Sequence, residues 1–521
     1  MSVLARIKKN SYVDSLILMR AASKVRESEG VHDVVIIMGT PQNKEIIIGT
    51  KLMTPEVEKA GVDDLIFTID AETPERAAEA LDDAEKAIFS PSSAAAATGE
   101  SDMVRVRSLQ GAVDVLSDAN LALFSIPGPY VREEAMRALK RDLNLMIFSD
   151  NVPLEDEVLI KRTAQERGLL VMGPDCGTAI ISGVALGFAN HVRRGSVGIV
   201  GASGTGTQEV ACLVDRLGCG ISHAIGTGGR DIKAEVGGIT MISGIELLMQ
   251  DEDTQVIVVI GKPPEPSVTR HIMACLKDCP KPVIVHFQGG REEIVEGTAV
   301  RYAGSLAEAA ALAVKCCGSG LDQDPGVEYD AGRLKQDMEA LSPEQTLVRG
   351  VFVGGTFCGE AAGILLEEFG EVYTNTGYPG ARTLSDGGLD TGHICIDMGE
   401  DEFTRGRPHP MLEPSVCRDR ILEEADNPRT AVILLDVVLG YGVHDDPAAV
   451  LVPVLAKARE AAATQGRHFA VVVHVCGTDG DPQVRRAQVE TLRAAGALIA
   501  QTNAGAARLA TRIAKRQSVD E

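Results

Sequence analysis

The sequence predicts an α/β protein of several domains in which most strands lie in parallel, doubly wound sheets. Its length of 521 residues corresponds to three or four domains of ordinary size. Hydrophobic residues make up 45% of the chain, whereas aromatic residues make up 3% and Trp is absent, so the cores must be built from Val, Ile, Leu and Ala. Short aliphatic runs alternate with helical patterns, as is typical of parallel strands that are buried on both faces.

The N-terminal part, residues 1–89, is predicted to form a small α/β domain. The expected elements are strands at Val3–Ile7, Val34–Met38 and Leu65–Ile69 and helices at Val13–Ser28 and Pro74–Ile88. The segment Ser90–Asp102 is rich in Ser, Ala and Gly, and we interpret it as a linker.

Residues 103–190 are predicted to form a doubly wound domain of the Rossmann type. The expected elements are strands at Leu121–Ile126, Leu145–Phe148 and Leu169–Met172 and a helix at Val131–Arg141. Strands and helices that alternate at this spacing favour a parallel sheet.

Residues 191–317 and 346–516 are predicted to form two further α/β domains, joined by a polar linker at Gly318–Gln345. The expected strands are Val197–Val200, Gly220–Ile225, Val256–Ile260 and Pro282–Phe287, then Val348–Val353, Ile394–Asp397, Thr430–Val437, Phe469–Val475 and Leu498–Gln501. The two domains look like loose copies of each other, because Val283–His286 matches Val471–His474.

The first of three glycine-rich turns, Gly201–Thr207, follows a strand and precedes a helix predicted at Gln208–Leu217. Unpaired backbone N–H groups at a helix start bind phosphate well when glycines let the ligand approach. We therefore predict anion binding by Ser203, Gly204, Thr205 and Gly206; the alternative is a tight turn that binds nothing.

Two more glycine-rich turns follow strands. Leu439–Pro447 contains Gly440 and Gly442 as further anion-binding candidates, and its His444 either contacts an anion or is a surface loop residue. Gly354–Glu360 is either a third binding turn or a simple helix entry.

The formal net charge of −23 argues against nucleic acid and anionic membranes as partners. The 11 Cys residues are scattered without zinc-finger spacing, and no apolar run reaches transmembrane length, so we expect a cytoplasmic protein. We assign no metal. The chain lacks a Walker A motif, a dinucleotide fingerprint and a G-x-S-x-G elbow.

Residues 120–317 resemble the α subunit of succinyl-CoA synthetase. Phe124–Tyr130 resembles that family's V-P-A-P-F turn, and Asp150–Pro153 resembles its E-G-I-P turn. Met172–Cys176 is similar to I-G-P-N-C, and Gly198–Thr205 is similar to G-I-V-S-R-S-G-T. The resemblance implies a CoA-binding-like Rossmann domain at 103–190 and a flavodoxin-like domain at 191–317.

Residues 395–516 resemble the C-terminal domain of the β subunit of the same family. Leu434–Gly442 stands where that family has V-N-I-F-G-G, and Val471–Gly477 stands where it has V-V-V-R-L-E-G. In the family, helices after these turns point at one phosphate from opposite subunits. An α-plus-β fusion preceded by a small domain is the arrangement of the FdrA family.

Three departures from the family separate this chain from an ATP-dependent acyl-CoA synthetase. The segment Gln288–Gly304, where the family carries its phosphorylated histidine, contains no His. The ATP-grasp module has no counterpart, and the family's glycine-rich CoA phosphate loop has no clear match before Asn120.

The FdrA resemblance implies a subunit of an oxamate carbamoyltransferase in allantoin breakdown, in which oxalurate and phosphate give oxamate and carbamoyl phosphate. The implied partners are other subunits of a hetero-oligomer. The expected roles are anion binding from one side by Ser203, Gly204 and Thr205 and from the other by Gly440 and Gly442, with His444 as an acid or an orienting donor.

Asn151, Asp175 and Pro127 are expected at strand ends, in a pocket for substrate or CoA. Cys176 is either a nucleophile or a buried structural thiol. Two other functions stay open. One is a CoA-thioester enzyme or CoA-binding subunit, and the other is a non-catalytic scaffold that senses a metabolite.

Overall fold

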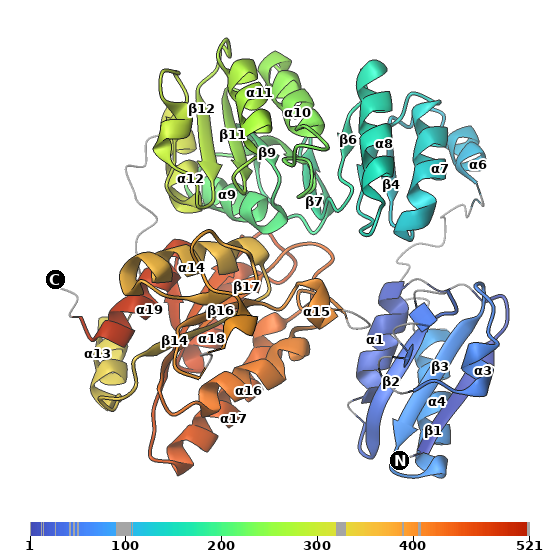
Figure 1. Cartoon of the computed structure of the whole chain (residues 1–521), viewed down its shortest axis with the longest axis vertical. Coiled ribbons are helices and arrows are strands. Elements are labelled where there is room, and N and C mark those ends of the chain that lie inside the picture. The colour runs from blue at the N-terminus through green and yellow to red at the C-terminus, as the bar shows by residue number, and fades with distance from the viewer. Residues whose placement is uncertain are drawn as a thin grey trace. The chain divides into compact units, whose positions relative to one another are not determined.

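The computed structural model divides the chain into two compact units (Figure 1). One unit comprises residues 1–105 and 400–416, and the other comprises residues 106–399 and 417–521. The residues that the structure describes are 2–11, 13, 15–26, 28–40, 43–44, 47–48, 50, 52–89, 106, 108–318, 330–387, 390–404 and 408–517. The predicted linker at 90–102 and residues 319–329 of the second linker lie outside the described residues.

The N-terminal unit contains a three-stranded antiparallel sheet in the order β1-β3-β2. Its elements are β1 (Ser2–Lys8), α1 (Ser15–Arg26), β2 (Val31–Met38), α3 (Pro55–Glu58), β3 (Leu65–Ala71) and α4 (Pro74–Phe89). Buried residues of α1 and α4 pack on one face of the sheet, and Ile47, Leu52 and Val57 pack on the other. The small predicted domain is therefore present, with antiparallel strands.

The larger unit begins with a three-stranded parallel sheet in the order β4-β5-β6. Its elements are α6 (Leu109–Val115), β4 (Leu121–Phe124), α7 (Gly128–Leu139), β5 (Asn144–Ile147), α8 (Leu154–Glu166) and β6 (Val171–Met172). The start of α7 packs so closely on the next turn that a Cβ on Gly128 would lie 2.3 Å from the carbonyl oxygen of Asn151. Glycine is therefore required where these two turns meet.

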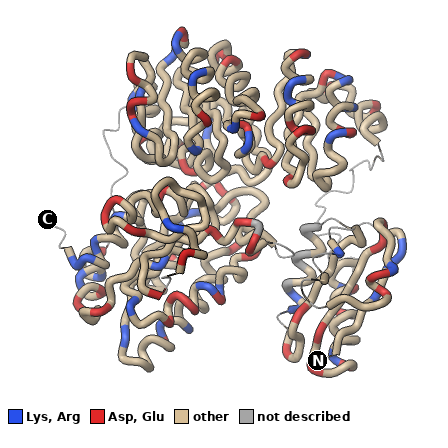
Figure 2. Tube along the Cα trace, viewed as in Figure 1, with Lys and Arg blue, Asp and Glu red and all other residues tan. Residues whose placement is uncertain are grey.

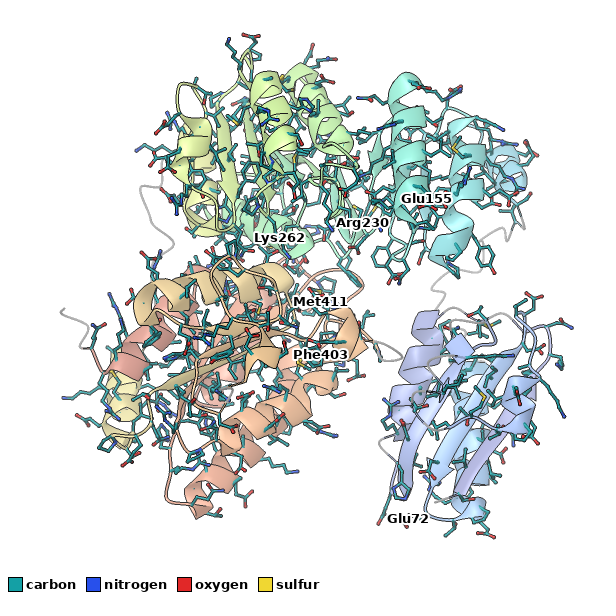
Figure 3. The ribbon with its side chains drawn as sticks, viewed as in Figure 1. Glu72, Glu155, Arg230, Lys262, Phe403 and Met411 are labelled. Carbon is teal, nitrogen blue, oxygen red and sulfur yellow. The ribbon has the colours of Figure 1, made fainter. Side chains whose placement is uncertain are left out.

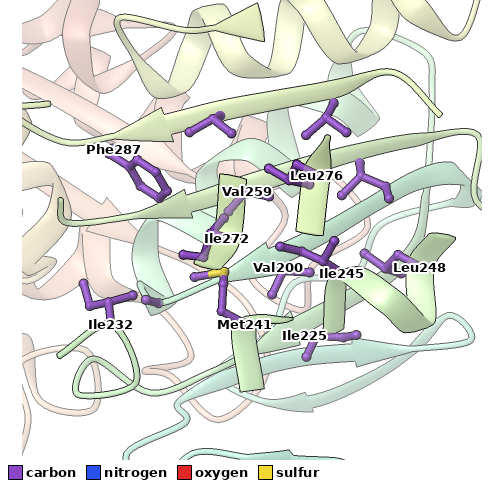
Figure 4. Close-up of a cluster of buried hydrophobic side chains, with 14 of the residues drawn as sticks. Val200, Ile225, Ile232, Met241, Ile245, Leu248, Val259, Ile272, Leu276 and Phe287 are labelled. Carbon is purple, nitrogen blue, oxygen red and sulfur yellow. The ribbon is translucent and has the colours of Figure 1, made fainter. Parts of the chain in front are cut away.

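The middle sheet has seven strands in the order β13-β12-β11-β9-β10-β7-β8. Its elements are β7 (Thr178–Ile181), β8 (Val184–Gly187), β9 (Arg194–Gly201), α9 (Gly204–Arg216), β10 (Ile221–Gly226), α10 (Ile239–Gln250), β11 (Val256–Gly261), α11 (Pro266–Leu276), β12 (Val283–Phe287), β13 (Arg301–Tyr302) and α12 (Leu306–Cys316). Figure 4 shows its aliphatic core, where Val200, Ile225 and Val259 face Met241, Ile245 and Ile272.

The predicted domain boundary at residue 190 cuts through this middle sheet. β7 pairs antiparallel with β10, so the β7–β8 hairpin belongs to the sheet that follows it in sequence. The hairpin is too short and too weakly patterned to have been recognised, and its hydrogen bonds to β10 form only in the tertiary structure.

The C-terminal sheet has six parallel strands in the order β15-β16-β14-β17-β18-β19. Its elements are α13 (Ala331–Ala340), β14 (Leu347–Phe352), α14 (Gly355–Phe369), β15 (Tyr373–Thr374), β16 (Ile394–Asp397), α16 (Arg418–Asp426), β17 (Thr430–Val438), α17 (Pro447–Thr464), β18 (Ala470–Cys476), α18 (Arg485–Ala494), β19 (Leu498–Ala500) and α19 (Asn503–Lys515).

The middle and C-terminal sheets confirm the loose repeat that the sequence predicts. In each, the first strand (β9 or β14) has three later strands on one side (β11-β12-β13 or β17-β18-β19) and an intervening strand of the same repeat (β10 or β16) on the other. The helix after that first strand, α9 or α14, packs with the last helix of its own repeat, and α9 also contacts α14 (Figure 1). Equivalent elements of the two repeats therefore meet.

Charged residues of both signs are interspersed along the described trace (Figure 2). Within the described ranges, none of the helices combines the length and the apolar character that a membrane crossing requires.

Candidate functional site

The first glycine-rich turn forms the start of α9. Ser203 is the N-cap, and its Oγ accepts a hydrogen bond of 3.0 Å from the N–H of Gly206. The hydroxyl of Thr207 donates to the carbonyl oxygen of Ser203 at 2.7 Å. Gly204 is exposed and Thr205 is buried. The predicted helix at 208–217 therefore begins earlier, and the turn glycines themselves supply its first unpaired N–H groups.

The start of α14 lies directly against the start of α9. The hydroxyls of Ser203 and Thr356 share a hydrogen bond. A Cβ on Gly206 would lie 3.2 Å from Cγ2 of Thr356, and a Cβ on Gly354 would lie 3.0 Å from Cγ2 of Thr205. The structure therefore brings Ser203–Gly206 together with the third glycine-rich turn.

Gly440 and Gly442 lie on another side of this region, after β17. A Cβ on Gly442 would contact the ring of Phe188 at 3.3 Å, and the Phe188 carbonyl accepts from the hydroxyl of Thr178 at 3.1 Å. The same Thr178 hydroxyl is 3.5 Å from a Cβ placed on Gly204. The two turns that the sequence pairs are thus connected through Thr178 and Phe188.

Two aspartates surround the start of α14. Asp436, near the end of β17, accepts hydrogen bonds from the N–H groups of Val353 at 2.7 Å and Gly354 at 2.9 Å. Burial raises the pKa of Asp436 to about 8. Asp397, at the end of β16, is so close that a Cβ on Gly355 would lie 2.5 Å from its Oδ2.

The start of α9 lacks these two carboxylates. Gly201 pairs with Gly226 of β10 and with Ile260 of β11. In the other repeat Phe352 pairs with Asp397, and Asp436 directly follows Leu435, the partner of Val351. A helix start attracts anions through its dipole and its unpaired N–H groups. The start of α9 is therefore the more suitable of the two for an anionic ligand.

Sequence reasoning missed both aspartates. Each is a single acid in an aliphatic run, Asp397 at the end of Ile394–Asp397 and Asp436 two residues before the end of Thr430–Val438, and that placement is the signal that could have identified them.

One exposed cation lies near the paired helix starts. Lys262 follows β11, and its Nζ donates to the carbonyl oxygen of Thr376 at 3.3 Å. Figure 3 shows Lys262 where the middle and C-terminal repeats meet. Gln288, after β12, donates to the carbonyl oxygen of Thr356 at 2.6 Å. The middle repeat thus presents donors toward the start of α14.

Pro127, Asn151 and Asp175 lie exposed at the carboxyl ends of β4, β5 and β6. Asn151 and Asp175 both have left-handed backbone conformations, with φ of 52° and 58°. Ser149 joins the three turns, because its Oγ accepts from the N–H of Ile126 at 2.9 Å and its carbonyl accepts from the N–H of Asp175 at 3.0 Å. The structure therefore gathers these three predicted residues on one edge.

Cys176 is buried below this edge. Its thiol donates to the carbonyl oxygen of Thr178 at 3.5 Å, and burial raises its pKa to about 12. Because the thiolate is the reactive form, this geometry favours the structural thiol over the nucleophile.

His444 lies in the loop after Gly442. Its Nδ1 accepts from the N–H of Asp446 at 3.0 Å, and Asp446 in turn caps α17 by accepting from the N–H of Ala449 at 3.1 Å. The imidazole therefore helps to shape its own loop, and its role as an acid stays a prediction.

Three family models match the chain. One described as CoA-ligase matches residues 351–513, and one described as CoA binding domain matches residues 192–289. The latter lies one domain later than the CoA-binding-like domain expected at 103–190. A third, described as AllF, heavy metal-associated domain, matches residues 1–104. The first two matches confirm the predicted fold class.

The N-terminal domain does not fit a thiolate-bound metal. Residues 1–104 contain no Cys, the first being Cys176. Among the residues that the structure describes, no three side chains of His, Cys, Asp or Glu gather as metal ligands.

Two solved structures match the chain at low similarity. PH0766 from Pyrococcus horikoshii OT3 matches with a TM-score of 0.34 and 13% identity, covering 80% of this chain and 89% of that one. ATP citrate lyase from Methanothrix soehngenii matches with a TM-score of 0.32 and 20% identity, covering 41% of this chain and 37% of that one.

Similar sequences identify the family. The α subunit of ADP-forming succinate–CoA ligase from Staphylococcus epidermidis is 29% identical over 28% of this chain and 48% of that subunit. A second α subunit, from Archaeoglobus fulgidus, is 29% identical over 28% of this chain and 51% of its own length. The chain thus spans about half the length of these subunits. YahF of Escherichia coli (strain K12), an uncharacterized protein, is 39% identical over 97% of this chain and 98% of YahF. The chain therefore belongs to the family of YahF, within the succinyl-CoA synthetase superfamily whose CoA-binding and CoA-ligase domains it carries.

Proposed function

We propose that this chain is a subunit of a phosphate-dependent carbamoyltransferase that converts oxalurate and phosphate into oxamate and carbamoyl phosphate. The observation that carries the proposal is the contact between the starts of α9 and α14, joined through Ser203 and Thr356. The AllF description of the model that matches residues 1–104 supports the place in allantoin breakdown that the FdrA resemblance implies.

The chemistry requires phosphate to be held beside a carbamoyl carbon. A phosphate oxygen attacks that carbon, the bond from the carbon to the oxamate nitrogen breaks, and the nitrogen leaves with a proton. The exposed N–H of Gly204 and that of Thr205 are the donors we assign to the phosphate. Donors at a helix start also stabilise the oxyanion that develops during attack.

Asp436 is the residue we assign to the departing nitrogen. A Cβ on Gly354 would lie 3.1 Å from Oδ2 of Asp436 and 3.0 Å from Cγ2 of Thr205, so the carboxyl and the start of α9 are close neighbours. With its pKa raised to about 8, Asp436 is mostly protonated at neutral pH and has a proton to give. His444 is the alternative acid, and other subunits of the complex complete the site.

A ligand screen by thermal unfolding tests the proposal on the full chain. Phosphate and carbamoyl phosphate at saturating concentration should raise Tm through mass action, whereas CoA, acetyl-CoA and ATP should not. Activity is measured by phosphorus NMR as carbamoyl phosphate formed from oxalurate and phosphate, with the chain alone and with the proteins that copurify with it.

Matched variants localise the ligand. The double variant Ser203→Ala, Thr356→Val removes both hydroxyls between the helix starts and should abolish the shift with phosphate. Ser108→Ala is the control, because Ser108 caps α6 in the same way, accepting from the N–H of Gly111 at 3.1 Å, outside the site. Equal phosphate shifts in both variants would exclude the paired helix starts as the binding site.

A CoA-binding subunit or CoA-thioester enzyme is the second candidate. It is favoured by the exposed edge that carries Pro127, Asn151 and Asp175 and by the matches to CoA-binding and CoA-ligase models. A Tm shift with CoA alone, lost in Asn151→Ala, would replace the transferase with this function. The absence of a Tm shift with every ligand would favour the third function, a non-catalytic scaffold.

A further inference from the structure

A pocket of about 280 Å³ lies between residues 180–192 and the turn after β17, which are remote in sequence. Its lining includes Val184 and Ala185 of the β7–β8 hairpin and Asn190, His191 and Val192 of the following segment. Tyr441, from the turn between β17 and α17, completes it. The paired helix starts do not contribute to this lining, so the pocket is distinct from the proposed transferase site.

The second glycine-rich turn explains how Tyr441 reaches the pocket. Gly440 and Gly442, on either side of it, have φ values of +131° and +75°, which L side chains rarely adopt. A Cβ on Gly440 would lie 2.7 Å from the carbonyl oxygen of Ala189, and the N–H of Tyr441 donates to that same oxygen at 2.9 Å. The two glycines thus hold the tyrosine against the segment that precedes His191.

The polar floor of the pocket is fixed before any ligand binds. Asn190 donates to Oδ2 of Asp481 at 2.9 Å and to the carbonyl oxygen of Leu439 at 2.8 Å. The N–H of His191 donates to Oδ1 of Asp481 at 2.7 Å, and the hydroxyl of Thr478 donates to the His191 carbonyl at 2.6 Å. A preformed polar floor of this kind is typical of small-molecule sites.

Two large side chains at the pocket are exposed without an evident role in the core. Tyr441 is 41% exposed and Val184 is 60% exposed. Nδ1 of His191 and the hydroxyl of Tyr441 lie 3.2 Å apart and share a hydrogen bond, which orients both rings. The pocket therefore offers an aromatic face, aliphatic neighbours and an imidazole ring.

Size and charge restrict the ligand. Small-molecule pockets commonly span roughly 300–1,000 Å³, so a pocket just below this range accepts one ring system rather than a long cofactor. The lining contains no Lys or Arg, and buried Asp481 lies beneath it, so phosphate groups are disfavoured. Flat bases stack on aromatic side chains whatever their sequence, since each base presents a π face.

We propose that this pocket binds an uncharged heteroaromatic ring of the nucleobase class, with Tyr441 stacked on its face and His191 hydrogen-bonded to its edge. The ligand is recognised by its ring, so a nucleoside binds and added phosphates bring no gain. The site stands whether or not the chain proves to be a carbamoyltransferase.

Adenosine is the probe, and titration calorimetry on the full chain is the measurement, with saturation-transfer NMR to detect weak binding. Tyr441→Ala should raise the Kd for adenosine at least tenfold, whereas Tyr441→Phe, which keeps the ring, should raise it much less. Leu247→Ala is the control, because Leu247 is also a large exposed apolar residue, at 47%, on α10 outside the pocket. Circular dichroism verifies that each variant is folded.

Several outcomes would overturn the assignment. One is the absence of adenosine binding to the folded chain at millimolar concentration, and another is equal affinity of Tyr441→Ala and the unchanged chain for adenosine. A preference of tenfold or more for AMP or CoA over adenosine, dependent on Tyr441, would show that phosphate is recognised and would also exclude an uncharged ligand.

Discussion

Glu209 of α9 and His474 of β18 form a hydrogen-bonded pair of 2.9 Å that is completely buried between the two repeats. The equivalent histidine of the middle repeat, His286 of β12, is also buried, and its Nε2 has no hydrogen-bond partner among the residues that the structure describes. Glu360 of α14, the counterpart of Glu209, instead accepts from the N–H of Leu306 in the middle repeat at 3.1 Å and from the side chain of Asn503 in its own repeat at 2.8 Å. The repeats therefore pair through equivalent positions but with different partners.

Removing one member of the Glu209–His474 pair should strongly destabilise the larger unit. Loss of one partner from a buried pair typically costs about 3–5 kcal/mol, because the other is left uncompensated. We expect a loss of this size for Glu209→Ala in urea unfolding, and a change close to zero for the exposed Glu252→Ala. Equal midpoints for the two variants would contradict the role of the pair.

The same pair should weaken in acid. Burial by itself would raise the pKa of Glu209, but attraction to His474 and the hydrogen bond between them bring it below its usual value. A lowered carboxyl pKa stabilises the fold above the unfolded pKa, and this contribution is lost as pH falls through the folded pKa. The free energy of unfolding should therefore fall less steeply with decreasing pH in Glu209→Gln than in the unchanged chain, as urea unfolding at acidic pH would measure.

Asp436 should give the opposite pH dependence. Its pKa is raised to about 8, so between pH 4 and 8 the folded chain retains a proton that the unfolded chain has lost. Stability then falls as pH rises, by at most roughly 1.4 kcal/mol per pH unit for one proton. Asp436→Asn should remove this slope, which urea midpoints measured from pH 5 to 8 would reveal. An identical slope in both proteins would contradict a protonated Asp436.

The two glycines of the first turn of α9 should respond differently to alanine. A Cβ on Gly206 would lie 2.7 Å from Oγ of Ser203 and 3.2 Å from Thr356, so Gly206→Ala should displace the cap and cost about 1–3 kcal/mol. A Cβ on Gly204 would meet only Thr178, at 3.5 Å, so Gly204→Ala should be tolerated. Thermal unfolding distinguishes the two variants, and phosphate binding should be lost only in Gly206→Ala.

The sequence predicted the strands well because a strand buried on both faces must be aliphatic throughout. Val256–Gly261 and Thr430–Val438 are buried along their entire lengths, and both stand close to where the aliphatic runs place them. The repeat was also visible, since His286 and His474 occupy equivalent strands. Local pattern was therefore sufficient for the long central strands of the middle and C-terminal sheets.

Relationships between distant segments were not predictable in this way. The contact of Ser203 with Thr356 depends on how the two repeats pack, and neither turn encodes its partner. The β7–β8 hairpin joins the sheet of the following domain through hydrogen bonds that have no signature in the chain. The antiparallel arrangement of the N-terminal sheet was not predictable for the same reason, because the relative direction of two strands is determined only when they pair.

Cys176 should resist alkylation in the native chain. Its thiol is 2% exposed and its pKa is raised to about 12, so almost no thiolate is available at neutral pH. Iodoacetamide followed by mass spectrometry should modify Cys176 only after unfolding, whereas Cys279, which is half-buried, should react sooner. If iodoacetamide labels Cys176 rapidly in the native chain, Cys176 is again a candidate nucleophile.

Lys161 should be essential for joining α8 to the segment after β10. Its side chain is 0% exposed and lies 3.0 Å from Glu157 and 2.7 Å from Asp231, and it also donates to the carbonyl oxygen of Thr227 at 3.0 Å. Lys161→Met fills much of the same volume but leaves two buried carboxylates without their shared cation. We expect a loss of about 3–5 kcal/mol in urea unfolding. The exposed Lys140→Met is the control and should leave stability unchanged. If the methionine variant at 161 proves as stable as the control, the buried network is not what holds α8 to the middle sheet.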